Sequence, residues 1–411
     1  MRITLECIAW LCGAGAVLGS LYMLVASQLT RRFLGRGSAM PVSYPAVTII
    51  KPLFGTEHAL LNNLSGFCTQ DYPGPIQYLF GVHDKNDAAL EVVESLRRLQ
   101  PGASISVVAD ARLYGPNRKM SNIMNMLPHV KHDILIFADS DVGVSPDYVR
   151  CVVGELQQPG VGLVTCLYRG VPDPGFWPRL SANSSNYHFL PGVVVGMALG
   201  LASPCFGQTI ALRRATLDEI GGFGQFTHHL AEDHAIGAAV RKLGQKVVVA
   251  RMLVTHACDE TSVTQLVAHE LRWSRTIRTI DPLGYFGSVL THPLALALLA
   301  IAFSGASSWS LPLVFVALCA RLALKLQLDR VLGQAPRDLW LVPLWDLASF
   351  AIFVSSFLSK RIIWRGYPFN VGHDGLLYPL GDTDTGAQSV YASTLVPNAA
   401  PPATEISLGP N

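Results

Sequence analysis

The sequence lacks the features of three common kinds of protein: nucleic-acid-binding proteins, zinc proteins and disulfide scaffolds. Its formal net charge is only +2, which argues against nucleic acid as the main partner, because such proteins carry clustered basic surface. The eight cysteines form no C-x-x-C pair and no regular framework of spacings. This pattern argues against both a zinc site and a disulfide scaffold. We therefore expect reduced, mostly buried cysteines in a protein that faces the cytosol.

Hydrophobic residues, by contrast, make up 50% of the 411 residues, enough for one large domain and several membrane segments. The stretch 5–27 is long enough to cross a bilayer and contains a charge only at Glu6. Arg31, Arg32 and Arg36 follow it, and no small-residue cleavage pattern is obvious. Because positive residues prefer the cytoplasmic side, we expect an uncleaved anchor whose C-terminal end lies in the cytoplasm.

Between residues 45 and 282, short β-rich runs alternate with helical patterns such as 88–99. The runs cover 47–50, 77–82, 104–108 and 134–138. Strands separated by helices predict an α/β domain with a mostly parallel, Rossmann-like sheet. Such a sheet binds its ligands at the carboxyl ends of the strands.

After this region the composition changes to three apolar blocks, at 286–304, 308–324 and 339–358. His292-Pro293 interrupts the first, and Pro343 and Asp346 interrupt the third, so each is a candidate for a re-entrant or interfacial segment. Three full crossings would leave cationic residues outside the cytoplasm. We expect two crossings and one re-entrant segment, which return Trp364-Arg365-Gly366 to the cytoplasmic side.

These patterns divide the chain into four parts. They are a transmembrane anchor (5–27), an α/β domain (45–282), membrane segments (283–370) and a disordered tail (371–411) whose composition is small, polar and proline-rich.

The motif Asp139-Ser140-Asp141 directly follows the apolar run 134–138. Residues i and i+2 of an extended segment point the same way, so the two carboxylates can clamp a divalent cation that also holds a diphosphate. An isolated motif of this kind is more often an acidic turn that closes a strand. Here it is followed by Glu232-Asp233 and by Arg272-Trp273, the latter just before the apolar blocks. Together the motifs predict a membrane-attached glycosyltransferase that uses a nucleotide sugar and Mg²⁺ or Mn²⁺.

Three residues are candidates for binding the nucleotide. Asp84 and Asp87 follow the second predicted strand, where a carboxylate can accept the ring N–H of a uracil; the alternative is a polar loop with a helix N-cap at Asp87. Lys119 can add a phosphate contact, or it can be a solvated loop lysine.

The general base is expected to be a carboxylate that reaches the acceptor hydroxyl. Asp233 is the preferred candidate and Glu232 a supporting residue; the alternative is that both are favourable charges in the first turn of a helix. Arg272 offers a fixed fork for phosphate and Trp273 a flat wall for an acceptor or sugar. The same pair is also typical of an anchor at the membrane interface.

In their order, these motifs resemble those of the ceramide-glucosyltransferase-like inverting glycosyltransferases of the GT-A fold. The residues that carry the resemblance are Lys51-Pro52-Leu53-Phe54-Gly55, Asp84, Asp139-Ser140-Asp141, Glu232-Asp233 and His269-x-x-Arg272-Trp273. The stretches 162–170 and 269–278 look closer still to the bacterial branch associated with hopanoid biosynthesis. The resemblance covers residues 45–370. It has one departure: His269 stands where the family usually has Gln or Arg.

The resemblance implies a nucleotide-sugar donor, a divalent cation, a lipid acceptor and Asp233 as the base. For the hopanoid branch the donor would be UDP-N-acetylglucosamine and the acceptor bacteriohopanetetrol, in a multi-pass protein of the bacterial inner membrane with a cytoplasmic catalytic domain. Its donor-binding residues would be Lys51, Asp84, Lys119, Asp139, Arg272 and Trp273, with Asp139 and Asp141 on the metal and Asp87, Glu232 and His269 in support.

Three alternatives stay open at this point. The first is a ceramide or other lipid glucosyltransferase that uses UDP-glucose. The second is a processive polysaccharide synthase, for whose channel three apolar blocks are few. The third is a catalytically silent membrane scaffold, which the presence of all the expected carboxylates disfavours.

Overall fold

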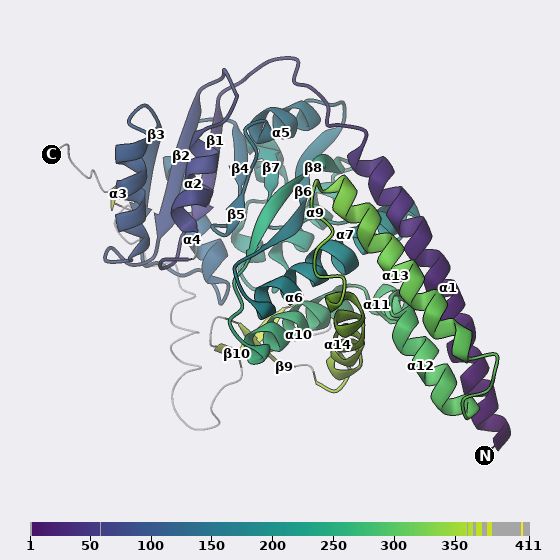
Figure 1. Cartoon of the computed structure of the whole chain (residues 1–411). Helices are drawn as coiled ribbons and strands as arrows, with labels where there is room; N and C mark the ends of the chain where they lie inside the picture. Colours follow the sequence, from purple (N-terminus) through teal and green to yellow (C-terminus); the bar gives the residue numbers. More distant parts are fainter. Residues whose placement is uncertain are drawn as a thin grey trace, which may run out of the picture. The chain divides into compact units, whose positions relative to one another are not determined.

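The computed structural model describes residues 2–57, 59–359, 361–364, 367–371, 376–379 and 404–405. The chain forms two compact units, and each combines segments that are distant in sequence (Figure 1). The α/β unit comprises Gly37–Tyr168, Pro204–Ala257 and Tyr367–Asn411. The helical unit comprises Met1–Arg36, Arg169–Ser203 and Cys258–Gly366.

The α/β unit is built on one large sheet. Its strands are β1 (Val47–Pro52), β2 (Ile76–Val82), β3 (Ser104–Ala109), β4 (Ile134–Phe137), β5 (Val142–Gly143), β6 (Val161–Pro172), β7 (Ile210–Arg213), β8 (Lys246–Cys258) and β12 (Thr404–Glu405). They follow the order β12-β3-β2-β1-β4-β7-β6-β8-β5. Strands β3, β2, β1 and β4 are parallel, whereas β7 runs antiparallel to both β4 and β6. The predicted α/β fold is confirmed, with a mixed rather than a mostly parallel sheet.

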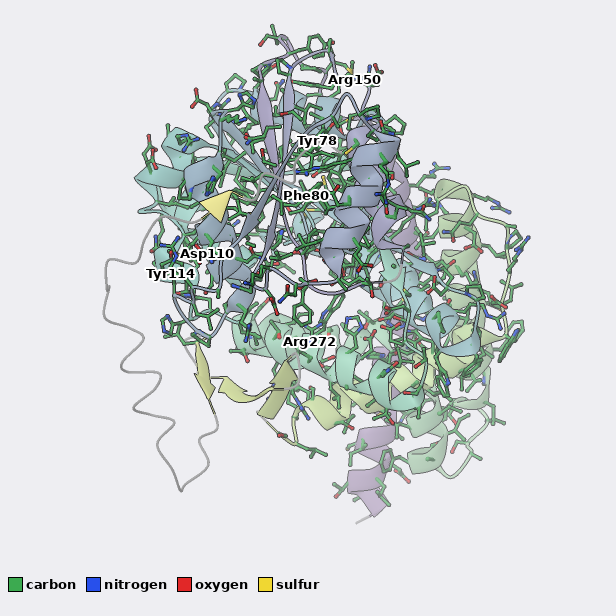
Figure 2. All side chains as sticks on the ribbon, turned by 90° about the vertical axis from the view of Figure 1, so that its left-hand side faces the viewer. Tyr78, Phe80, Asp110, Tyr114, Arg150 and Arg272 are labelled. Atoms are coloured by element: carbon green, nitrogen blue, oxygen red, sulfur yellow. The ribbon has the colours of Figure 1, made fainter. Side chains whose placement is uncertain are left out.

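The parallel half of the sheet determines where the polar loops lie. Tyr78 and Phe80 lie along β2, which is paired with β1 on one side and β3 on the other, and both are buried, as the continuous apolar character of these strands requires (Figure 2). In register, Ile50 of β1 is opposite Leu79 on one side and Phe137 on the other. The carboxyl ends of β1, β2 and β4 therefore meet at one edge of the sheet, where the predicted motifs begin.

Helices pack on this sheet. They are α2 (Leu60–Cys68), α3 (Ala89–Leu99), α4 (Arg118–Met126), α5 (Tyr148–Leu156), α8 (Arg214–Glu219) and α9 (Glu232–Lys242), with short helices η1 (Leu127–His129) and η3 (Gly224–Phe226). The apolar core takes Met120 and Ile123 from α4 and Ile236 and Val240 from α9. Because these side chains are buried, the first turns of α4 and α9 hold fixed positions.

The second unit is helical. Its elements are α1 (Arg2–Leu34), α6 (Phe176–Ser184), the π-helix η2 (Ser185–Phe189), α7 (Leu190–Ala198), α10 (Val263–Ile280), α11 (Pro282–Gly287), η4 (Ser288–Thr291), α12 (Pro293–Ser304), α13 (Leu311–Val331), α14 (Leu341–Ser356) and β9 (Arg361–Trp364). Helix α1 packs along α12 and α13 (Figure 1). Strands β10 (Tyr367–Val371) and β11 (Leu377–Pro379), whose residues belong to the α/β unit, form an antiparallel pair.

Within the described part of the chain, two helices, α1 and α13, are long and apolar enough to cross a membrane, and a bent pair formed by Pro282–Thr291 and Pro293–Ser304 could supply a third span. The predicted N-terminal apolar helix is confirmed, and Arg31 and Arg32 lie in its last turn. The predicted interruption at His292-Pro293 is also confirmed, because the chain bends there by 73°. The number of crossings stays a prediction, and Arg365, Gly366 and most of 371–411 lie outside the described residues.

The units do not follow the continuous range 45–282 expected from the sequence. Residues 169–203 and 258–282 belong to the helical unit instead. The reason is packing: α7 contacts α1, and α6 contacts α14 and α10. Short apolar helices can be buried equally well by a sheet or by other helices, and sequence pattern alone does not distinguish the two.

Candidate active site

The acidic motif lies in a tight loop between β4 and β5. Strand β4 ends at Phe137, and Ser140 and Asp141 form a turn. The main chain of this loop is held by the Lys51 ammonium, which donates to the Asp139 carbonyl oxygen at 2.8 Å. The expected geometry, two carboxylates on one face of an extended strand, is therefore wrong. The turn gives the two carboxylates different neighbours.

Lys51 is completely buried, and its ammonium lies 3.6 Å from the centre of the Phe67 ring. Burial lowers the pKa of Lys51 to about 7, although Asp141 and Asp139 act in the opposite direction. The contacts of this side chain are thus with the acidic loop itself. Its predicted direct role in binding the donor stays a prediction.

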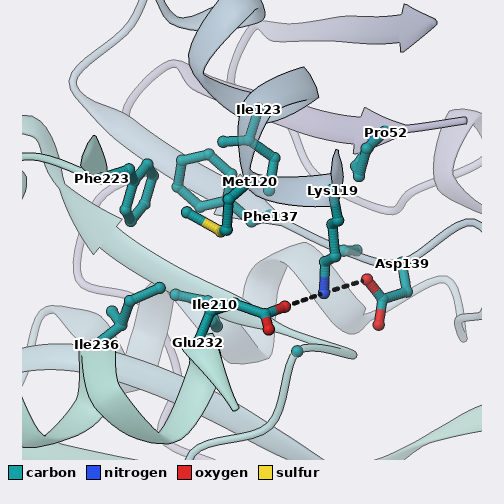
Figure 3. A pocket seen from close by; sticks show the side chains of 12 residues that line it. Pro52, Lys119, Met120, Ile123, Phe137, Asp139, Ile210, Phe223, Glu232 and Ile236 are labelled. Carbon is teal, nitrogen blue, oxygen red and sulfur yellow. Dashed lines mark ion pairs between the residues drawn. The ribbon is translucent and has the colours of Figure 1, made fainter. Parts of the chain in front are cut away.

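Asp139 is joined by Lys119 to Glu232, so that ion pairs link three elements of the α/β unit. The Lys119 ammonium, from the first turn of α4, lies 2.6 Å from Asp139 Oδ1 and 3.1 Å from Glu232 Oε1 (Figure 3). The second oxygen of Glu232 accepts a hydrogen bond from the buried Asn117 amide at 3.1 Å. Burial opposes the charge on Lys119, but Asp139 and Glu232 outweigh it and raise the Lys119 pKa. Lys119 is therefore an ammonium ion between two carboxylates, not a solvated loop lysine.

Asp233 lies beside this chain of charges but has different partners. Its Oδ2 accepts a hydrogen bond from the Gly207 amide at 3.0 Å, and its Oδ1 accepts one from the His234 amide at 2.7 Å. Burial, reinforced by the neighbouring Glu232, raises the pKa of Asp233 to about 7. A carboxylate with this pKa can take up a proton near neutral pH. The two oxygens of Glu232, by contrast, are engaged by Lys119 and Asn117.

Asp141 is partnered by a residue from a distant strand. Its Oδ2 lies 3.3 Å from His256 Nδ1, because Val142 of β5 is paired with His256 of β8. Burial would raise the pKa of Asp141, but His256 and Lys51 outweigh it and the pKa falls to about 2. The other oxygen, Oδ1, is buried and has no hydrogen-bond partner among the described residues. An ionised oxygen in this state is costly unless a ligand completes it.

These residues fit the divalent cation that the sequence predicts. Mg²⁺ and Mn²⁺ prefer carboxylate oxygens, and Asp141, whose Oδ1 has no hydrogen-bond partner among the described residues, is two positions along the chain from Asp139. Among the described residues, the one cluster of three metal-ligand side chains is His188, His292 and Asp346 in the helical unit. There the Arg321 guanidinium contacts both Asp346 and His188, so an internal cation already fills that cluster.

The two predicted uracil-side carboxylates differ in role. Asp87 Oδ1 accepts hydrogen bonds from the Gly55 amide at 2.8 Å and from the Ala89 amide at 2.9 Å, so it ties the loop after β1 to the start of α3. Asp84 is exposed, and its Oδ1 accepts a hydrogen bond from the Asn86 amide at 2.9 Å. Asp84 is thus accessible to a ligand, whereas Asp87 organises the loop.

The last motif lies on α10 of the helical unit. His269 Nδ1 is 2.6 Å from Glu260 Oε1, which also accepts a hydrogen bond from Ser181 at 3.0 Å. The ring of Trp273 lies one turn away and meets the His269 ring edge-on at 4.8 Å. Although burial acts the other way, His269 lowers the pKa of Glu260, so this carboxylate is ionised. The donor-binding roles of Arg272 and Trp273 stay predictions.

Three residues of the site were not expected from the sequence. Asn117 precedes α4 and accepts from the Met120 amide, so an N-cap pattern could have revealed it. His256 lies within a long strand, and Gly207 in a loop before β7, where no local signal marks either. His256 reaches the site because β8 pairs with β5, and Gly207 lies in the turn just before β7, which pairs with β4.

The chain belongs to glycosyl transferase family 21, whose sequence model matches residues 11–377. Known relatives include ceramide glucosyltransferase 1 of Caenorhabditis elegans, 26% identical over 224 residues, which are 54% of this chain and 47% of the relative. Ceramide glucosyltransferase 3 of the same organism is 23% identical over 357 residues, 82% of this chain and 75% of the relative. The predicted similarity to ceramide glucosyltransferases is confirmed, and the closer similarity to the hopanoid-associated branch stays a prediction.

Among solved structures, a mannosyltransferase from Pyrobaculum calidifontis in complex with GDP-Man and Mn²⁺ is similar. It is 20% identical, with a TM-score of 0.48, and the match covers 85% of this chain and 99% of that one. Our chain spans about half the length of ceramide glucosyltransferase 1.

Proposed function

We propose that this protein transfers a sugar, with inversion, from a UDP-sugar to the hydroxyl of a lipid in the membrane. The observation that carries the proposal is the charge arrangement at the carboxyl edge of the sheet. Asp141 offers an ionised oxygen without a partner, Lys119 an ammonium between two carboxylates, and Asp233 a carboxylate with a pKa of about 7. These are the parts that a sugar transfer requires: a diphosphate grip and a base.

In this proposal each residue has a separate task. The Asp233 carboxylate takes the proton of the acceptor hydroxyl, and its hydrogen bond from the Gly207 amide keeps the carboxylate oriented. Lys119 contacts the donor phosphates, and Asp84 accepts the ring N–H of the uracil. Asp139 and Asp141 would hold Mg²⁺ or Mn²⁺, whose charge stabilises the diphosphate as it leaves. Lys51 fixes the loop that carries both of these carboxylates.

Membrane helices in the same chain support a lipid acceptor. A lipid can present its hydroxyl at the bilayer surface while its apolar body stays among the tails. The family and the names of the relatives agree with an acceptor of this class. On the resemblance of the motifs, we propose N-acetylglucosamine as the sugar and bacteriohopanetetrol as the acceptor, in the inner membrane of a bacterium with the α/β unit in the cytoplasm.

A second candidate is glucosyl transfer from UDP-glucose to ceramide, which the names of the relatives favour. The test uses the purified full-length protein in lipid nanodiscs with Mn²⁺. Each of UDP-N-acetylglucosamine and UDP-glucose is combined with each of bacteriohopanetetrol and ceramide, and products are identified by mass spectrometry. The anomeric configuration from NMR tests inversion.

We expect product from the first donor and the hopanoid, with turnover roughly 10² to 10⁴-fold lower for Asp233→Asn. Product only from UDP-glucose and ceramide would establish the second candidate. Absence of UDP release with every lipid, from protein that is folded and binds UDP, would leave only the silent scaffold.

A further inference from the structure

The ammonium of Lys119 is held in a pocket of charges that includes a proposed ligand of the divalent cation. It lies 2.6 Å from Asp139 Oδ1 and 3.1 Å from Glu232 Oε1, and the Lys119 side chain is only 17% exposed. Figure 3 shows the ammonium directly between these two carboxylates. The positive charge that faces Asp139 is therefore supplied by the protein itself.

Gly207 shows how closely these groups converge. A Cβ atom built on Gly207 would lie 2.8 Å from Lys119 Nζ, 3.4 Å from Asp139 Oδ2 and 3.8 Å from Asp233 Oδ2. The absence of a side chain at this position leaves room for the ammonium beside both acids. The apolar side chains of Met120 and Ile236 line the same pocket, so the ammonium has few other places to go within it.

A divalent cation on Asp139 and an ammonium at hydrogen-bond distance from the same carboxylate repel each other. One of them must weaken its contact with Asp139 when the other binds. The ammonium of Lys119 is carried on a flexible four-carbon chain and can move. The diphosphate of a bound donor offers this ammonium a new anionic partner. Donor binding would then remove the competing charge from the metal site.

We propose that Lys119 is an internal counter-ion of the acidic site that competes with the divalent cation for Asp139, and that the donor diphosphate relieves this competition. Lys119 thereby couples donor binding to metal binding, so that each tightens the other, as linkage requires. This inference rests on the proposed function, because it assumes that Asp139 and Asp141 hold a divalent cation.

The test measures Mn²⁺ binding to the full-length protein in nanodiscs, using the EPR signal of free Mn²⁺, without and with saturating UDP. We expect Lys119→Met to bind Mn²⁺ about tenfold more tightly than the wild type without UDP, because one competing charge is removed. UDP should then tighten Mn²⁺ binding by a factor about tenfold smaller in the variant than in the wild type. Turnover should nevertheless fall.

Gly207→Ala provides a second variant that keeps the charge. Its Cβ would displace the ammonium from the position it now occupies, so Mn²⁺ binding without UDP should also tighten. Lys242→Met, at an exposed lysine of α9, is the matched control and should change nothing. Asp141→Asn should abolish binding and so confirms that the signal comes from this site.

The outcomes separate the two proposals. Mn²⁺ binding by the wild type that is equal or tighter than that of Lys119→Met, with Asp141→Asn still silent, would overturn the competition and leave the metal site intact. Absence of Mn²⁺ binding by the wild type even with UDP would remove the metal site, and the competition with it.

Discussion

Both units of this protein contain ion pairs, but in different states. In the α/β unit, Asp139 and Lys119 remain 26% and 17% exposed, and Asp141 has an oxygen without a partner. In the helical unit, Arg321 and Asp346 are 3% and 0% exposed, and Arg321 Nε donates to Asp346 at 2.7 Å. The first arrangement is open to a ligand and the second is complete in itself.

The helical unit shows what a closed network does. Helix α13 carries Arg321, Lys325 and Asp329 on one face at helical spacing, and all three are buried. The Lys325 ammonium lies 2.9 Å from Asp329, and both contact the Tyr187 hydroxyl. Charges within apolar helices are often a sign of function. Here they pair with each other, so we infer that they hold the helices together. We assign the chemistry to the site of Asp139, Asp141 and Lys119 in the α/β unit, called the incomplete site below because Asp141 has an oxygen without a partner.

The largest expected effect comes from the incomplete site. Asp141→Asn should lower turnover by about 10³-fold, the order seen when one preorganised electrostatic group is removed. The melting temperature should fall by a few degrees, because the amide loses the attraction to His256 and Lys51 that lowers the pKa of the Asp141 carboxyl to about 2. Sugar transfer and thermal unfolding of the same preparation check this. Full activity in EDTA would show that no divalent cation is needed.

The second largest effect is expected from replacing the proposed base, Asp233. Asp233→Asn should reduce turnover by roughly 10² to 10⁴-fold, with little change in donor affinity, whereas Glu232→Gln should cost less. Because burial raises the pKa of Asp233 to about 7, wild-type turnover should increase with pH and level off above that value. A pH profile of both proteins tests this, since the dependence should disappear in Asp233→Asn. The reverse order of the two substitutions would make Glu232 the base.

Substitutions in the buried ion pair of the helical unit, Arg321 and Asp346, should lower stability rather than turnover. Arg321→Met leaves Asp346 buried without its partner, which should lower the free energy of unfolding by about 3–5 kcal/mol. Replacing both, with Arg321→Met and Asp346→Leu, should recover most of the loss. Asp71→Asn is the control, because Asp71 is 68% exposed and its ion pair with Arg150 lies at the surface. This substitution should lower the free energy of unfolding by at most about 1 kcal/mol. A mild effect of Arg321→Met would show that the network is not structural.

The smallest expected effect is on stability at the incomplete site, and it comes from Asp233, the proposed base. The Asp233 carboxyl keeps its proton in the folded protein up to about pH 7, whereas an unfolded chain releases it near the ordinary value of 3.8. Stability from this group is therefore present below pH 3.8 and lost as the pH rises to about 7. The amide of Asp233→Asn has no proton to release in this range, so the variant should keep its stability as the pH rises. Its melting temperature should therefore exceed that of the wild type by a few degrees at pH 8 and not at pH 4. Equal values at pH 8 would contradict the burial of this charge.

The sequence determined the elements and the class of the site. The runs at 47–50, 77–82, 104–108 and 134–138 became strands β1 to β4, and 5–27 became part of α1. These patterns are local, because an apolar run or a helical spacing is complete within 10–30 residues. The carboxyl ends of parallel strands must share an edge, so the approximate place of Asp84 and Asp139 followed as well.

Only the tertiary structure decided which charges meet. Lys51 contacts Asp139 across 88 positions of the chain, and Asn117 contacts Glu232 across 115. His256 reaches Asp141 because β8 pairs with β5, and the ammonium of Lys119 fits because Gly207 lacks a side chain. Such contacts depend on how far-apart elements pack, and packing is specified by the whole core and not by any one segment.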